Sequence, residues 1–199
     1  FAEKNSQSVL PIASLTKLMT ALVAAENIDL RKSVIITEEM LQAYGELEQL
    51  QAGKQYRVVE LFYPLLVASS NDTAEAVAGF LGRDRTIQMM NDKAKAMFLG
   101  NTTFVDPSGF DPGNVSTAQD MFYLARYIAN NRPPMLQITK GENVRSYGEP
   151  QFSRDELWNK NVFVADTSFV GGKTGYTTAA KHTGVFLFQF GAKDNTVRT

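Results

Sequence analysis

Helical periodicity fills most of this chain, and strand-like sequence is concentrated near its C-terminal end. Apolar residues recur at helical spacing over residues 15–23, and further helical stretches are predicted up to residue 128. Three later segments, at 161–165, 169–173 and 183–190, read as strands, the last of them rich in Phe and Val. Three strands seldom complete a sheet, and both ends lie beside strand-like sequence. We therefore expect an α/β domain that is truncated at both ends.

Capping and turn residues divide the helical region. Asn71 or Asp72 is suited to cap a helix over residues 73–81. Residues 101–114 are predicted as a loop because they contain the turn sequences D-P-S-G and D-P-G. Residues 116–119 have the form of a capping box for the next helix, and Pro133-Pro134 is expected to end that region.

Composition excludes several classes of protein. The chain has 199 residues, a length typical of one domain, and its net charge of -1 argues against nucleic acid as a partner. Without Cys it has no disulfide, Fe–S cluster or thiolate zinc site, and a single His makes a histidine-built metal site improbable. The apolar runs reach only half of the ~20 residues that a membrane span requires. We expect no membrane anchor in this chain.

A Ser–His–Asp triad is the first nucleophilic arrangement to consider. Its base would have to be His182, which lies between Lys181 and Thr183 in a predicted polar turn before a strand. The chain has no G-x-S-x-G sequence around a serine. We interpret His182 as an exposed or structural residue and reject the triad.

The sequence Ser14-Leu15-Thr16-Lys17 offers a nucleophile and a base without histidine. The i, i+3 spacing places Ser14 and Lys17 on one helix face, about 5–6 Å apart at Cβ. A lysine acts as a base only when it is neutral, which at pH 7 costs roughly 4–5 kcal/mol from its ordinary pKa. Desolvation and a second cation nearby are the means of lowering that pKa. A helix start with a solvated lysine is the alternative interpretation.

Two further segments are ambiguous on their own. Ser69-Ser70-Asn71 lies between two predicted helices, where Ser and Asn commonly serve as caps. In residues 171–177, Lys173 and Thr174 offer a cation and a hydroxyl beside a glycine-flanked strand, suited to bind a carboxylate and to pair with an extended substrate. A simple β-turn is the alternative. A phosphate-binding P-loop is excluded because its first glycine position is Thr167.

Together, S-x-x-K, S-x-N and K-T-G in this order are the motif set of penicillin-binding proteins and class A β-lactamases. The segments at 11–21, 69–74, 106–120 and 172–177 resemble the D-alanyl-D-alanine carboxypeptidases of low molecular mass. The resemblance covers nearly the whole chain.

The resemblance implies a role for each motif residue. Ser14 would be the acyl-forming nucleophile and Lys17 its base, while Ser69 would relay a proton to the leaving D-alanine. Asn71 would hold Lys17 and a substrate amide, and Lys173 would keep the pocket positive. The implied substrate-binding residues are Thr174, which would bind the terminal carboxylate, and Gly175, Tyr176 and Thr177. Backbone N–H groups of Ser14 and Tyr176 would form the oxyanion hole. No metal or organic cofactor is implied.

The implied fold is α/β (α+β) and β-lactamase/transpeptidase-like, an antiparallel sheet flanked by helices with a mostly helical subdomain. Residues 1–199 would form a single catalytic domain, with 1–26 and 162–199 in the α/β part and 27–161 in the helical part. By this resemblance, we expect the 199 residues to lack the family's opening strand, final strand and closing helix, and the accessory β-domain and amphipathic anchor of many members. His182 stands where a small residue, often Gly, is expected.

The expected function is removal of the terminal D-alanine from peptidoglycan stem peptides that end in D-Ala-D-Ala, with β-lactam antibiotics as acylating inhibitors. The expected location is extracytoplasmic, in the periplasm or on the outer face of a bacterial cytoplasmic membrane. A DD-endopeptidase of the same fold is the first alternative. A class A β-lactamase is the second, although Glu156-Leu157-Trp158-Asn159 matches its E-x-x-L-N sequence poorly and lies too near Lys173. A non-catalytic β-lactam sensor domain is the third.

Overall fold

The computed structural model describes residues 3–42, 50–147, 151–152, 157–191 and 197–198. Its α-helices are α1 Thr16–Asn27, α2 Val58–Tyr63, α3 Asn71–Leu81, α4 Arg83–Ala96, α5 Ala118–Asn131 and α6 Pro133–Thr139. Shorter helical turns are η1 Ala13–Leu15, η2 Glu39–Gln42, the π-helical η3 Pro64–Ala68 and η4 Arg145–Tyr147. The strands are β1 Leu10–Pro11, β2 Ser33–Ile35, β3 Gln55–Arg57, β4 Val115–Ser116, β5 Phe169–Thr177, β6 Lys181–Phe188, β7 Phe190–Gly191 and β8 Val197–Arg198.

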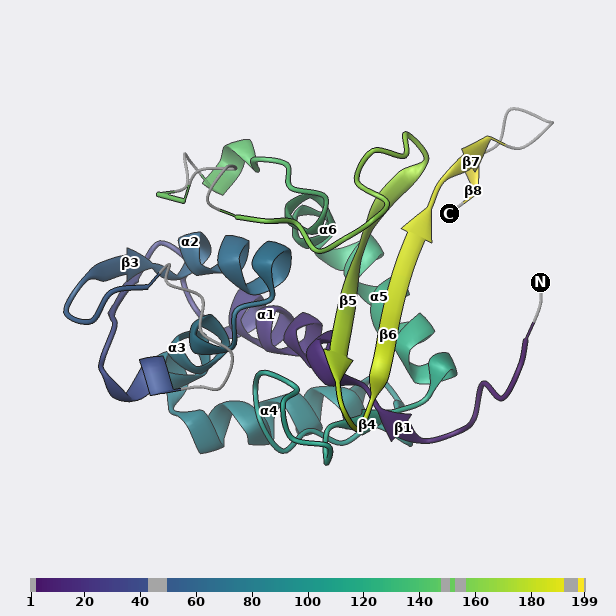
Figure 1. Cartoon of the computed structure of the whole chain (residues 1–199), viewed down its shortest axis with the longest axis horizontal. Coiled ribbons are helices and arrows are strands. Elements are labelled where there is room, and N and C mark those ends of the chain that lie inside the picture. The colour runs from purple at the N-terminus through teal and green to yellow at the C-terminus, as the bar shows by residue number, and fades with distance from the viewer. Residues whose placement is uncertain (1–2, 43–49, 148–150, 153–156, 192–196, 199) are drawn as a thin grey trace.

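Helix α1 forms the centre of the molecule. Its residues 16–24 are all buried, so this helix is covered on every side by other elements. Figure 1 shows α2 and α3 on one side of α1 and the β5–β6 hairpin on the other. The predicted helix over residues 15–23 is therefore confirmed, and its N-terminal end points to the hairpin.

Strands β5 and β6 form the antiparallel hairpin that positions the second half of the site. Lys173 pairs with Val185, and Tyr176 pairs with His182. Helix α6 packs closely against β5, since a Cβ atom added at Gly171 would lie 2.7 Å from the carbonyl oxygen of Leu136 in α6. The predicted strands at 169–173 and 183–190 correspond to this hairpin, and His182 lies within β6 instead of in a turn before it.

The predicted strand at 161–165 is wrong. The segment forms turns, because the Asn161 N–H donates to Oδ1 of Asn159 and the Phe163 N–H donates to Oδ1 of Asn161. Asparagine side chains that accept backbone N–H bonds in this way compete with strand pairing.

Three boundary predictions need correction. Pro133-Pro134 begins α6 instead of only ending the preceding region, since proline is tolerated in the first turn of a helix. Helix α3 is capped by Ser70, whose Oγ accepts the Thr73 N–H, and not by Asn71 or Asp72. The cap of α5 is Thr117, one residue later than the predicted capping box begins.

Among the described residues, no helix combines the length and apolar character that crossing a membrane requires.

Candidate active site

The N-terminal end of α1 is held in a strained and tightly packed arrangement. Ala13, directly before Ser14, has a φ of +49°, which a residue with a side chain rarely adopts. A Cβ atom at Gly109 would lie 1.9 Å from the carbonyl oxygen of Ala13, and one at Gly175 would lie 2.8 Å from the backbone nitrogen of Ser14. Only glycine fits at these two positions. The loop before β4 and strand β5 therefore both contact the backbone that carries Ser14.

Lys17 is buried and donates three hydrogen bonds from its Nζ. They go to Oγ of Ser14 at 3.1 Å, to Oδ1 of Asn71 at 2.7 Å and to the carbonyl oxygen of Ser108 at 2.6 Å. Burial lowers the pKa of Lys17 from 10.5 to about 7. The positive charge of Lys160 lowers this pKa further, while the carboxylates of Asp106 and Glu75 raise it. A large fraction of Lys17 is thus neutral at neutral pH, next to a serine hydroxyl.

A second serine–lysine pair lies beside the first. Lys173 is buried, and its Nζ donates to Oγ of Ser69 at 2.8 Å and to the carbonyl oxygen of Thr174 at 2.8 Å. Burial, with the charges of Lys17 and Lys160, lowers the pKa of Lys173 well below its ordinary value. Ser69 has a φ of +65° at the end of the π-helical turn η3, a conformation that holds its hydroxyl toward β5.

The remaining predicted residues line β5. Thr174 is half-buried, and its Oγ1 lies 3.5 Å from the carbonyl oxygen of Lys160, a long hydrogen bond that leaves the hydroxyl available to another partner. Gly175 lies against Ser14, and the ring of Tyr176 packs against that of His182 in a tilted arrangement, with a centroid distance of 4.8 Å and an interplanar angle of 44°. The hydroxyl of Thr177 has a structural contact instead, because its Oγ1 accepts the Ala180 N–H and so closes the hairpin turn.

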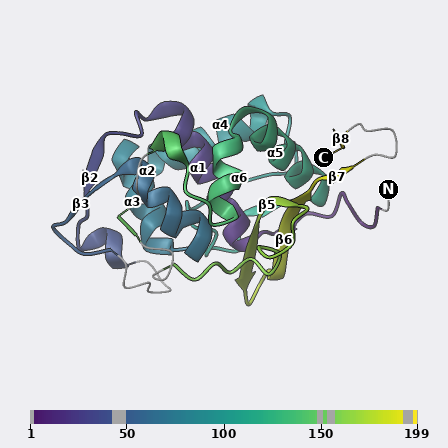
Figure 2. The same cartoon turned by 90° about the horizontal axis from the view of Figure 1, so that it is seen from above.

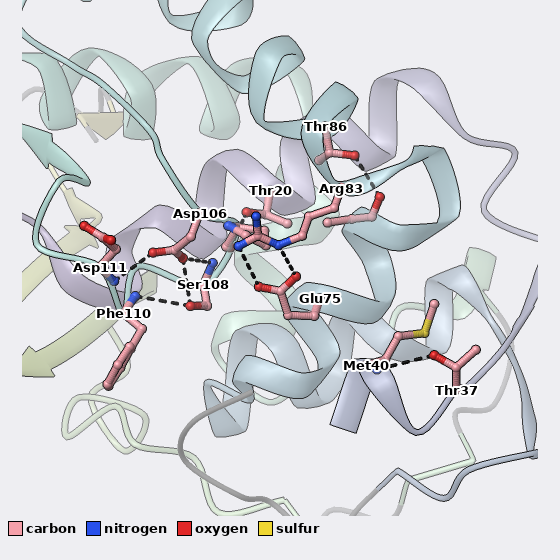
Figure 3. Close-up of polar contacts among 12 residues, drawn as sticks. Thr20, Thr37, Met40, Glu75, Arg83, Thr86, Asp106, Ser108, Phe110 and Asp111 are labelled. Atoms are coloured by element: carbon pink, nitrogen blue, oxygen red, sulfur yellow. Dashed lines mark hydrogen bonds and ion pairs between the residues drawn. The ribbon is translucent and has the colours of Figure 1, made fainter. Parts of the chain in front are cut away.

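Asp106 is a component of the site that the sequence analysis did not identify. Its Oδ1 accepts hydrogen bonds from the Ser108 N–H, the Gly109 N–H and the Ser108 hydroxyl, at 2.6, 2.6 and 2.8 Å. Its Oδ2 accepts from the Asp111 N–H at 2.7 Å and from Nδ2 of Asn114 at 2.6 Å. Figure 3 shows the contacts with Ser108 and Asp111. This carboxylate fixes the loop whose Ser108 carbonyl oxygen binds Lys17.

The pKa of Asp106 reflects this network. Burial of the carboxyl group would raise the pKa, but the hydrogen bonds from the Asp111 N–H and from Ser108 and Gly109 outweigh burial and lower it. Nearby, Arg83 pairs with Glu75 at 2.9 Å (Figure 3), which places a partly compensated carboxylate in reach of Lys17. The sequence signals for this loop are the turn residues of 106–109 and the resemblance of residues 106–120 to the family, and neither assigns a role to Asp106.

The arrangement combines a nucleophile, a base with a lowered pKa, a second buried lysine and the backbone edge of a strand. Such a set is suited to acyl transfer at a carbonyl group. Within the described ranges, no group of three or more His, Asp or Glu side chains is placed to hold a metal ion.

Comparison with known proteins agrees with this chemistry. Residues 1–196 match the family model described as D-alanyl-D-alanine carboxypeptidase. The D-alanyl-D-alanine carboxypeptidase DacB2 of Mycobacterium tuberculosis is 35% identical over 190 residues, covering 92% of this chain and 63% of DacB2. A D-alanyl-D-alanine endopeptidase of Pseudomonas aeruginosa is 29% identical over 191 residues, covering 90% of this chain and 59% of the relative.

A solved structure shares the fold. The crystal structure of a D-alanyl-D-alanine carboxypeptidase from Mycobacterium tuberculosis H37Rv superposes with a TM-score of 0.82 at 30% identity, covering 97% of this chain and 73% of that one. The expected α/β fold class is confirmed. The chain spans about half to two thirds of the length of the curated relatives that it matches. With a family model matched along nearly all of its length, the chain belongs to the D-alanyl-D-alanine carboxypeptidase family.

Proposed function

We propose that this chain is the catalytic part of a serine D-Ala-D-Ala carboxypeptidase, which removes the terminal D-alanine of peptidoglycan stem peptides. The observation that carries the proposal is the 3.1 Å contact between Oγ of Ser14 and Nζ of buried Lys17, whose pKa is about 7. A serine hydroxyl next to a neutral amine is an activated nucleophile. β-Lactams would acylate the same oxygen, because their ring amide offers a comparable carbonyl group.

The proposed reaction has two halves. Neutral Lys17 accepts the Ser14 proton while Oγ attacks the carbonyl carbon of the penultimate D-alanine. The resulting oxyanion is stabilised by the backbone N–H groups of Ser14 and Tyr176, a contribution of roughly 3–4 kcal/mol for each donor. The amide bond then breaks as the proton held by Lys17 is relayed through the Ser69 hydroxyl to the departing D-alanine nitrogen, which leaves Lys17 neutral again. Water, deprotonated by the same base, hydrolyses the ester and restores Ser14.

The other residues hold the reactants. Asn71 orients Lys17 and a substrate amide, and Lys173 keeps the pocket positive. Thr174 binds the terminal carboxylate, and residues 175–177 form the edge along which the peptide lies. In this proposal residues 1–199 act as one transpeptidase-like domain, with 1–26 and 162–199 as its α/β part and 27–161 as its helical part. No cofactor or nucleic acid takes part, and the site of action is extracytoplasmic.

The direct test is to incubate the protein with a stem pentapeptide that ends in D-Ala-D-Ala and to measure free D-alanine. Release of D-alanine with turnover is the expected result. Faster cleavage of a cross-linked peptide dimer would instead favour the endopeptidase, an alternative supported by a relative of that name. Acylation by benzylpenicillin without any peptide turnover would indicate a sensor domain and contradict the proposal.

Replacing Thr174 with valine is expected to weaken substrate binding more than catalysis. The variant keeps the shape of the side chain but loses the hydroxyl that binds the carboxylate, a hydrogen bond to a charged group worth about 1.5–3 kcal/mol. We expect KM for the pentapeptide to rise by about tenfold or more, with a smaller change in kcat. Thr174→Ser is the matched control and should restore KM. An unchanged KM in Thr174→Val would remove the proposed role.

Asp106→Asn is expected to move the pH dependence of acylation. The negative charge of Asp106 raises the pKa of Lys17, so its removal lowers that pKa and shifts the acid limb of the acylation rate to lower pH. The new amide would also face the donors of Asp111 and Asn114, costing about 1–3 kcal/mol of folding stability for each unsatisfied donor.

Asp111→Asn is the control for this shift. Asp111 lies in the same loop, but it is exposed and its carboxylate accepts only the Gly113 N–H at 2.7 Å among the described hydrogen bonds. When benzylpenicillin acylation rates are measured from pH 5 to 9, the acid limb of the rate profile should move to lower pH in Asp106→Asn but not in Asp111→Asn. An equal shift in both variants would mean that Asp106 has no specific effect on Lys17.

A further inference from the structure

Phe98 occupies an unusual position directly after α4. Its φ is +58°, and the N–H groups of Phe98 and Leu99 donate to the carbonyl oxygens of Lys95 and Ala94, both at 2.9 Å. This is the left-handed turn that ends many helices, and glycine is the usual residue there because a side chain is strained. The Phe98 side chain is also 91% exposed. A backbone position that disfavours side chains thus carries a large aromatic ring that faces solvent.

A cavity of about 300 Å³ opens beside this turn. It is lined by Met97, the neighbour of Phe98, and by Tyr123, Arg126, Tyr127, Asn130 and Asn131 of α5. The turn is held against α5, because the Asn101 N–H donates to Oδ2 of Asp120 at 3.0 Å. The strained backbone of Phe98, its exposed ring and the cavity lined by Met97 therefore lie next to one another.

The exposed face of α5 extends this surface with aromatic rings. Phe122 is 57% exposed and Tyr123 is 37% exposed, and their rings meet edge to face at a centroid distance of 5.5 Å. The guanidinium of Arg126 lies 5.6 Å from the Phe122 ring and 5.2 Å from the Tyr123 ring. The rings are thereby held in place beside a planar group of hydrogen-bond donors.

This combination favours an uncharged ligand that has both apolar faces and polar edges. Aromatic faces contact the C–H surface of a sugar ring, and guanidinium and amide groups bind its hydroxyl and acetamido oxygens. Among the described residues that line the cavity, none carries a carboxylate. A lipid surface would make no use of the asparagine amides, which lie on the cavity wall.

We propose that the surface formed by Phe98, Phe122, Tyr123 and the cavity lined by Arg126 binds a polymer of N-acetylated amino sugars. Figure 2 shows α4 and α5 along one side of the molecule and the β5–β6 hairpin along the other. The glycan would therefore be held on different elements from those that carry Lys173 and Thr174. The choice of an amino-sugar polymer rests on the proposed function, since the stem peptide is attached to such a glycan.

Calorimetric titration of the whole chain with the N-acetylglucosamine tetramer tests the proposal. Saturable binding is expected, and it should weaken about fivefold or more in Phe98→Gly and in Tyr123→Ala. Phe98→Gly should unfold at the same temperature as the wild type or higher, because glycine relieves the strained turn. A loss of binding without a loss of stability is a result that a purely structural role would not give. Ile35→Thr, which alters an exposed apolar residue on β2, is the matched control.

Each remaining outcome overturns the proposal. They are the absence of saturable tetramer binding, tetramer binding that neither variant changes, and binding of anionic phospholipid vesicles in place of the tetramer. Benzylpenicillin acylation of Ser14, measured on the same samples, separates this result from the proposed function. If acylation proceeds without tetramer binding, only the glycan surface is wrong.

Discussion

Ser14→Ala is expected to remain folded and to form no covalent adduct with benzylpenicillin. Among the described residues, the variant loses the one hydroxyl that lies within hydrogen-bond distance of Lys17 Nζ, because the other two described partners of Nζ are an amide oxygen and a backbone carbonyl. Alanine fits the helix start without strain, since Ser14 is half-buried within η1. Intact-mass spectrometry over time should show one adduct on the wild type and none on the variant.

Thr16→Val is the control for this experiment. Thr16 lies two residues from Ser14, and its buried Oγ1 has no hydrogen-bond partner among the described residues. Its removal should therefore leave the adduct unchanged and cost no stability. A normal adduct on Ser14→Ala would show that another residue is the nucleophile. Loss of the adduct in both variants would point to a disturbed helix start instead of a lost nucleophile.

The motif residues could be predicted from sequence only as a set, because each segment alone also fits a helix start, a helix cap or a turn. Ser14 and Lys17 share a helix face by their spacing, and Lys173 lies in a strand rich in Gly. The burial of both lysines, which shifts their pKa values, follows from packing between distant segments. Lys17 contacts the carbonyl oxygen of Ser108, 91 residues away. No local pattern contains that contact.

The fold prediction was wrong where several neighbouring residues could form the same local hydrogen bond. Ser69-Ser70-Asn71-Asp72 offers four candidate caps, and only the backbone conformation of Ser70, at φ -61° and ψ 128°, selects the one used. The segment at 161–165 contains two Val and one Phe, but the side chains of Asn159 and Asn161 accept hydrogen bonds from its backbone N–H groups. The sequence predicts Asp106 only as a turn residue, because the five hydrogen bonds of its carboxylate depend on the fold of the whole loop.

Lys17→Met is expected to slow benzylpenicillin acylation by about 10²–10⁴-fold, the usual contribution of a general base. Methionine fills the buried space without an amine, so Ser14 keeps its hydroxyl but loses the group that accepts its proton. The wild-type acylation rate should fall below pH 7 as Lys17 becomes protonated. The residual rate of the variant should lack this acid limb. An acid limb that persists near pH 7 would assign the base to another residue.

The same substitution should change how stability depends on pH. Unfolded Lys17 binds its proton up to pH 10.5, whereas folded Lys17 binds it only up to about pH 7. Between these values the unfolded state holds the extra proton, so the free energy of unfolding rises with pH by as much as about 1.4 kcal/mol per pH unit. Below pH 7 both states are protonated, and the cost of the buried charge is fully present.

Lys17→Met should therefore show a smaller rise in stability between pH 7 and pH 10 than the wild type. Its absolute stability is a poorer measure, because Asn71 and the Ser108 carbonyl lose a donor at every pH. Urea unfolding at a series of pH values gives the slope, and Lys32→Met, which removes an exposed lysine, should leave that slope unchanged. Equal slopes in the wild type and Lys17→Met would mean that the Lys17 pKa is not lowered by folding, and a charged Lys17 could not act as the base of Ser14.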